Sequence, residues 1–201
     1  MFPRFWGLIL LLAATSCNTF PELSAIRLPR DPPKPLGAER TVFACCNLRV
    51  LDETEITWRN WQSVDEFLPV GTELLLSGGP REYVLRDPRN GRTFNLDIGA
   101  PGDDFLEKFV VSSPRSSGDF SPEAREAIEK GVARIGMTRR EIYAALGPPH
   151  MVGDYDTDAM TLEQIENFDT WVWRRGTFAE KIVVRFSPGM NLVLETEGVH
   201  E

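Results

Sequence analysis

Few residues of this 201-residue chain could carry out catalytic chemistry. Its two histidines are His150, which follows two prolines, and His200, which stands one residue from the end. Neither is placed as the base of a serine or cysteine nucleophile would be. The sequence also has no phosphate-binding glycine loop and no zinc-protease motif. We therefore predict that the protein is not an enzyme, and we expect no catalytic residue, no cofactor and no small-molecule substrate.

Three alternating acids that begin at Asp154 have the opening spacing of a calcium-binding loop. Alternate oxygens along such a loop can converge on a hard cation. The remainder of the pattern is missing, because Ala159 stands where a glycine is needed and Ile165 where a bidentate glutamate is needed. We expect a solvated acidic loop over residues 153–167 and assign no metal ligand.

Two adjacent cysteines, Cys45 and Cys46, are unusual in a chain expected outside the cytoplasm, where exposed thiols tend to oxidise. Neighbouring side chains of a regular strand point to opposite faces, so a disulfide between them would be strained. The favoured interpretation is two separately buried thiols. A vicinal disulfide and an intermolecular bridge are the alternatives.

The third cysteine, Cys17, follows a segment with the features of a lipoprotein signal. Arg4 precedes an apolar run over residues 5–14, which is too short to span a bilayer comfortably, and small residues lead up to the cysteine. The pattern predicts a signal peptide over residues 1–16 and lipid attachment, with palmitate among the acyl groups, at Cys17. The alternative is ordinary secretory cleavage near Ser16.

The charge balance argues against nucleic acid as a partner. Asp and Glu number 30 against 22 Lys and Arg, which gives a net charge of −8. Phosphate backbones and anionic lipid surfaces are repelled by such a balance. We therefore expect contact with the membrane through the N-terminal lipid anchor and no binding of nucleic acid.

The order of composition along the chain predicts its domains. Residues 17–40 are rich in proline without an apolar period and are expected to form a lipidated tether. Residues 41–112 hold short β-runs broken by turn residues, which indicates a small antiparallel β-barrel. Asn90-Gly91 lies between two of these runs and predicts a two-residue hairpin turn. Residues 113–120 are a polar linker.

Residues 121–201 are expected to form a second domain that folds on its own and begins with two helices. Ser121 followed by proline is a typical helix start. Thr138 and Glu141 form a capping box that starts the second helix, and Gly147 ends it. The first helix is expected to face the core with a stripe at three- and four-residue spacing: Ala124, Ala127, Ile128, Gly131 and Ile135.

Alternating residues toward the C-terminus predict strands that complete an α+β arrangement of three antiparallel strands under the helices. The residues expected on the apolar face are Ile182, Val184, Phe186, Leu192 and Leu194. Trp171 and Trp173 share one face of the strand before them. We expect these tryptophans in the core, with an exposed partner-binding patch as the alternative. Trp58, Trp61 and Phe67 are expected to fill the barrel core.

The stretch G-M-T-R-R-E-I-Y-A-A-L-G-P-P, together with the two tryptophans and the strands after them, resembles the SmpA/OmlA lipoproteins, the BamE-like family of the bacterial outer membrane. The resemblance covers about residues 121–197. It implies a helix-helix module with a three-stranded antiparallel sheet. A weaker resemblance, over residues 68–72, is to the strand entry of bacterial SH3-like barrels.

The family resemblance implies a binding or scaffold protein on the periplasmic face of the outer membrane, with envelope proteins as partners and a role in envelope or outer-membrane-protein assembly. The alternatives are binding of a soluble enzyme, since β-lactamase-inhibitory proteins are similar to this module in fold, and binding of peptidoglycan. The residues proposed to contact a partner are Arg139, Arg140, Trp171 and Trp173.

Overall fold

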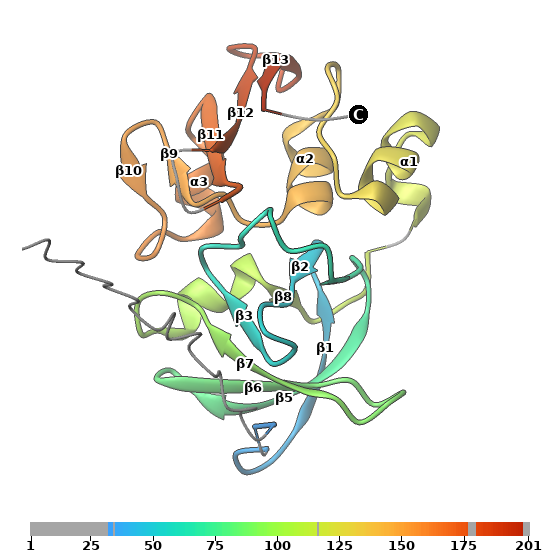
Figure 1. Cartoon of the computed structure of the whole chain (residues 1–201), viewed down its shortest axis with the longest axis vertical. Coiled ribbons are helices and arrows are strands. Elements are labelled where there is room, and N and C mark those ends of the chain that lie inside the picture. The colour runs from blue at the N-terminus through green and yellow to red at the C-terminus, as the bar shows by residue number, and fades with distance from the viewer. Residues whose placement is uncertain (1–31, 34, 116, 177–179, 199–201) are drawn as a thin grey trace, which may run out of the picture. The chain divides into compact units, whose positions relative to one another are not determined.

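The computed structural model describes residues 32–33, 35–115, 117–176 and 180–198. It is a mixed α+β structure in which strands predominate, with a curled half-barrel sheet and few helices (Figure 1). The predicted signal peptide and Cys17 lie outside the described residues. No helix in the described part of the chain is long and apolar enough to cross a bilayer.

The first half of the described chain is built on a six-stranded sheet with the order β3-β7-β6-β5-β1-β8. Its strands are β1 (Arg40–Ala44), β3 (Glu55–Thr57), β5 (Glu73–Gly79), β6 (Glu82–Arg86), β7 (Thr93–Asp97) and β8 (Val110–Val111). A separate antiparallel pair joins β2 (Leu48–Arg49) to β4 (Phe67–Leu68). The expectation of a purely antiparallel barrel is wrong, because β3 pairs with β7 in parallel.

The β6–β7 hairpin is where the sequence predicted a two-residue turn at Asn90-Gly91. The connection is longer, because the N–H of Asp87 donates to the carbonyl of Arg92 at 2.8 Å and the N–H of Gly91 donates to the carbonyl of Asp87 at 2.8 Å. The buried carboxylate of Asp87 also accepts from the N–H of Arg89 at 2.9 Å. This side-chain bond stabilises the wider turn, in which Gly91 has a positive φ of 75° and Asn90 does not.

Residues of the predicted tether and of the predicted linker make contacts with the rest of the fold. The tether was expected to reach residue 40, yet the N–H of Leu36 donates to the Ser77 hydroxyl at 2.9 Å, and Glu39 pairs with Arg86 at 2.5 Å. These residues therefore already contact the sheet. The linker over residues 113–120 ends with Phe120, which is buried in the common core.

The second half begins with the two predicted helices, α1 (Pro122–Lys130) and α2 (Arg139–Leu146). The predicted caps are confirmed: the Ser121 hydroxyl accepts from the third residue of α1, and the Thr138–Glu141 capping box is complete. The Glu141 carboxylate also accepts from the N–H of Ser121 at 3.1 Å, so it joins the starts of both helices. Burial acts to raise the pKa of Glu141, but these hydrogen bonds hold it below its usual value.

The second sheet has five strands rather than the three that were expected, in the order β10-β9-β11-β12-β13. The three predicted strands are β11 (Thr170–Arg174), β12 (Lys181–Phe186) and β13 (Val193–Glu197), and they pair antiparallel. The acidic segment over residues 153–167 is not a simple loop. With Met151 and Val152, it supplies the hairpin β9 (Met151–Val152) and β10 (Tyr155–Asp156), and it contains the short helix α3 (Leu162–Glu166) with its own capping box.

Hydrogen bonds donated by residues of the first half cap the C-terminal end of α2. The last carbonyls of a helix have no partner within it. Here the N–H of Asn47 donates to the carbonyl of Ala144 at 2.9 Å, and the Asn47 side chain donates to that of Ala145 at 3.0 Å. Side chains of Asn60 and Gln62 donate to the carbonyl of Leu146. The two halves also share one cluster of buried apolar side chains.

Gly147 ends α2 as predicted, and the close contact between the two halves explains why glycine stands there. A Cβ at this position would lie 2.5 Å from the Asn60 amide nitrogen and 2.7 Å from the Asn47 carbonyl oxygen. Its φ of 72° is positive, and together with a ψ of −166° it lies in a region that is adopted almost only by glycine. The close approach of the two halves thus requires a residue without a side chain.

Candidate binding surfaces

Three exposed apolar side chains lie along the backbone ladder where the chain enters α2. Ile135, Met190 and Leu194 have 70%, 66% and 55% of their surface exposed. A short ladder, in which the N–H of Gly136 donates to the carbonyl of Val193 at 3.0 Å and the N–H of Arg139 donates to that of Asn191 at 3.2 Å, places the backbone of Ile135 near that of Leu194 at one end and that of Met190 near Arg140 at the other. Large apolar side chains gathered in this way are typical of protein contacts.

Arg140 directly follows this ladder in the chain and carries a positive charge. Its side chain is 57% exposed and lies 3.5 Å from the carboxylate of Asp119. We refer to Ile135, Arg140, Met190 and Leu194 as the α2-entry surface. Of the four residues predicted to contact a partner, Arg140 alone lies on this surface.

The other three predicted contact residues are inside the fold. Arg139 donates to the side chain of Asn191 at 2.8 Å, to the carbonyl of Phe168 and to the carboxylate of Asp169. Trp171 and Trp173 are fully buried, so the core interpretation is confirmed for them. The indole N–H of Trp171 donates to the carbonyl of Ile165 at 3.2 Å, and that of Trp173 to Gly147 at 3.1 Å. These residues build the fold: the tryptophans are not exposed, and the Arg139 side chain is 11% exposed.

Sequence periodicity assigned two residues of the α2-entry surface to the core. Ile135 was placed on the buried stripe of the first helix, but α1 ends at Gly131 in a left-handed conformation. Leu194 was placed on the inner face of the last strand, but a register irregularity in the β12–β13 pairing leaves Val193 buried instead. Sequence periodicity therefore missed these two surface residues because one lies beyond the end of a helix and the other lies where the strand pairing is irregular.

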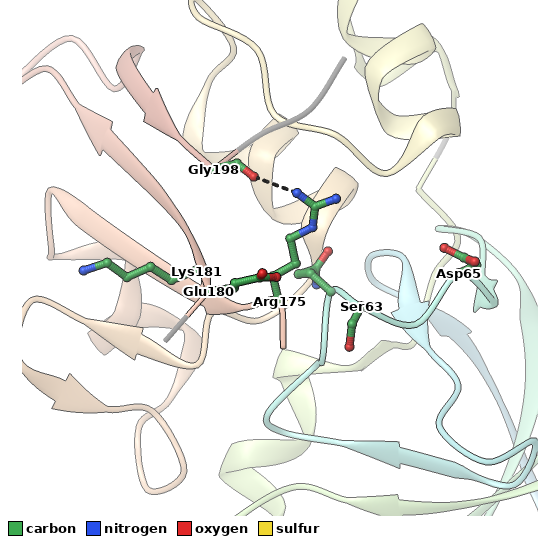
Figure 2. Close-up of a pocket in the computed structure, with 7 residues that line it drawn as sticks. Ser63, Asp65, Arg175, Glu180, Lys181 and Gly198 are labelled. Carbon is green, nitrogen blue, oxygen red and sulfur yellow. Dashed lines mark hydrogen bonds between the residues drawn. The ribbon is translucent and has the colours of Figure 1, made fainter. Parts of the chain in front are cut away.

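A second candidate is the polar cleft drawn in Figure 2, of about 550 Å³. It is lined by Gln62, Ser63, Asp65, Arg175, Glu180, Lys181 and Gly198. The backbone N–H of Gln62 donates to the carbonyl of Arg174 at 2.9 Å, which attaches the first half to β11 here. The Arg175 guanidinium donates to the carbonyl of Gly198 at 3.4 Å. Arg175 and two carboxylates, those of Asp65 and Glu180, line the cleft, whereas Figure 2 shows the Lys181 ammonium pointing away from Arg175. The cleft therefore suits a polar ligand with both charges.

An apolar pocket of about 540 Å³ lies between β4 and α1. Phe67, Val70, Phe120 and Ile128 contribute to its lining, with Arg115 at its edge. One guanidinium nitrogen of Arg115 is buried without a hydrogen-bond partner among the described residues. Phe67 was expected in the barrel core; it is only partly buried and lines this pocket instead.

His150 is a packing residue at the contact between the halves. Its ring stacks on that of Trp58 with centroids 5.0 Å apart and planes inclined by 17°. The residue is 3% exposed, and burial, reinforced by the charge of Arg174, holds its pKa below the usual value. Trp58 thus packs on the second half rather than only filling the barrel. The nearest carboxylate, that of Asp156, is 3.6 Å from Nε2.

Lys108 is the most unusual charged group of the described residues. It lies in a 3-10 helix, η1 (Asp103–Lys108), and is fully buried. Its ammonium donates to the carbonyls of Thr157 at 2.8 Å and Asp158 at 3.1 Å. Burial lowers its pKa to about 8. The lysine therefore joins η1 to the acidic segment, where the described residues hold no cluster of three metal-ligating side chains.

Comparison of the chain with known proteins identifies no matching protein family, no curated relative and no similar solved structure. Function must therefore be inferred from the surfaces themselves and from the sequence resemblance.

Proposed function

We propose that this chain is a lipid-anchored binding protein on the periplasmic face of the bacterial outer membrane, and that it holds an envelope protein at the α2-entry surface. The exposure of Ile135, Met190 and Leu194 beside Arg140 is the observation that carries the proposal. The sequence resemblance to BamE-like lipoproteins and the predicted lipoprotein signal over residues 1–16, directly before Cys17, support the location.

The surface combines apolar area with a single charge, as protein contacts commonly do. Apolar side chains at the centre of a contact supply most of the binding energy, and arginine is enriched among the residues that matter most. An exposed salt bridge such as that of Arg140 with Asp119 contributes little to stability. Arg140 can therefore exchange Asp119 for a carboxylate of a partner at small cost.

Crosslinking in cells tests this proposal. A photo-crosslinking amino acid at Ile135 or Leu194 should capture one defined envelope protein, and the same group at Tyr155 should not. Tyr155 is a matched control because it is 61% exposed and lies on β10, at the opposite edge of the same sheet. Equal products from all three positions would refute a specific surface, and capture of a soluble enzyme would favour the inhibitor-like alternative.

The polar cleft of Figure 2 favours peptidoglycan as a second candidate ligand. Peptidoglycan stem peptides carry both carboxylates and amines, and the cleft is lined by Arg175 together with Asp65 and Glu180. Titration with soluble muropeptides should then give saturable binding that Arg175→Ala weakens. Binding that is unchanged in this variant would remove the cleft from consideration.

A further inference from the structure

We infer that Cys45 and Cys46 form a two-electron redox site that closes to a vicinal disulfide within the folded protein. The chain leaves β1 at Ala44 and bends through both cysteines, so their side chains do not alternate as they would in a strand. Both residues are fully buried, and their sulfur atoms lie 3.1 Å apart. The two thiols are therefore neighbours, contrary to the expectation of two separate ones.

The backbone on both sides of the pair is fixed. The N–H of Cys45 donates to the carbonyl of Phe109 at 2.9 Å, and the N–H of Asn47 donates to that of Ala144 at 2.9 Å. A disulfide has sulfur atoms about 2.05 Å apart, so closure needs an approach of about 1 Å. Small side-chain rotations can supply part of that approach while both backbone bonds stay in place.

The hydrogen bonds around the pair accommodate the oxidised form. The carbonyl of Lys108 faces three donors: the Cys45 thiol at 3.1 Å, the Cys46 thiol at 3.7 Å and the Tyr143 hydroxyl at 2.8 Å. A carbonyl oxygen has only two lone pairs. Closing the disulfide removes both S–H groups and leaves the carbonyl with Tyr143, so no buried donor or acceptor loses its last partner.

The oxidant is a low-molecular-weight disulfide, RSSR. One cysteine thiolate attacks RSSR to give a mixed disulfide and releases RS⁻, and the second thiolate then displaces another RS⁻ as the Cys45–Cys46 bond forms. Two protein thiols and RSSR thus become the vicinal disulfide and two RSH. Burial raises the pKa of the Cys46 thiol, so exchange is expected during folding or local opening rather than in the closed structure.

Refolding in a glutathione buffer tests the inference. In the full chain carrying Cys17→Ser, Cys45 and Cys46 are the remaining thiols, since the sequence contains three cysteines. It is unfolded under reduction, refolded with excess glutathione disulfide, and then alkylated in denaturant for intact-mass measurement. We expect a mass lower by two hydrogen atoms, no alkylation, and a near-ultraviolet circular dichroism spectrum like that of the reduced protein.

Two results would overturn the inference: alkylation of both cysteines after oxidative refolding, or a disulfide found only in protein that has lost its tertiary spectrum. The variant Cys17→Ser with Cys46→Ser is the matched control. Its single thiol should take up one glutathione and cannot lose two hydrogen atoms. These outcomes do not depend on partner binding at the α2-entry surface, so the two proposals stand or fall separately.

Discussion

Replacing Lys108 by methionine should change how the stability of the protein depends on pH. The pKa of this buried lysine is about 8, against 10.5 for the free side chain. Below pH 8 both states carry the proton. Between about pH 8 and pH 10.5 the unfolded chain holds a proton that the folded chain lacks. The free energy of unfolding therefore rises with pH in this window. The contribution grows through this window and is complete above it.

The size of the effect follows from the same two values. One pKa unit corresponds to about 1.36 kcal/mol, so the full window from about 8 to 10.5 is worth about 3 kcal/mol. From about pH 7.5 to about pH 9.5, the free energy of unfolding should change by a smaller amount, about 2 kcal/mol. The wild-type protein should gain this amount relative to Lys108→Met over that interval. Comparison of the two proteins cancels other groups that titrate there, such as the Cys46 thiol, whose raised pKa acts in the opposite direction.

The variant should fold, because the carbonyls that Lys108 contacts keep other donors. The N–H of Met160 donates to the carbonyl of Thr157 at 3.2 Å, and that of Ala100 donates to Asp158 at 3.1 Å. Denaturant unfolding at a series of pH values is the assay, with the exposed Lys181→Met as control. If the free energy of unfolding changes with pH in the same way for wild type and Lys108→Met, the buried lysine is not the origin of the pH dependence.

Three further outcomes are expected. Cys17→Ala should release the protein from detergent-extracted membranes into the soluble fraction, and unchanged partitioning would refute lipid attachment at this residue. Thr138→Ala should lower the free energy of unfolding by about 0.5–2 kcal/mol and leave crosslinking at Ile135 intact; lost crosslinking at full stability would show that the cap itself binds the partner. A fragment of residues 121–201 should unfold at lower denaturant concentration than the full chain, because it lacks the donors of Asn47 and Asn60. Equal midpoints would contradict that reasoning.

Features that depend on a few neighbouring residues were predictable from the sequence. The Thr138–Glu141 box and the helix start at Ser121 are decided within four residues, and the structure has both. Pairings between distant segments were not predictable. The parallel pairing of β3 with β7 and the bond from Asn47 to Ala145 join residues far apart in the chain, and no local pattern specifies them.

The candidate surface was missed for a related reason. Periodicity places an apolar residue on a face only while the helix or strand continues. Ile135 follows the end of α1, and Leu194 follows an irregular pairing, so both patterns were extended past the point where they hold. Arg139 and Arg140 were both proposed as contacts from their place in the capping-box stretch, and burial separates them, because Arg140 is exposed and Arg139 is not. Trp171 was expected in the core, with a surface patch as the alternative, and it is buried.

The two ends of α2 have different partners, and this difference determines which end is free to bind. At its C-terminal end, Asn47, Asn60 and Gln62 of the first half occupy the carbonyls of three successive residues. At its N-terminal end Thr138 and Glu141 form the cap, and the further hydrogen bonds there, from Ser121 to Glu141 and from Arg139 to Asn191, stay within the second half. Because the helix has eight residues and rises about 1.5 Å for each, the α2-entry surface lies about 12 Å from the end that the first half holds. A partner can therefore bind there without displacing any bond that joins the two halves.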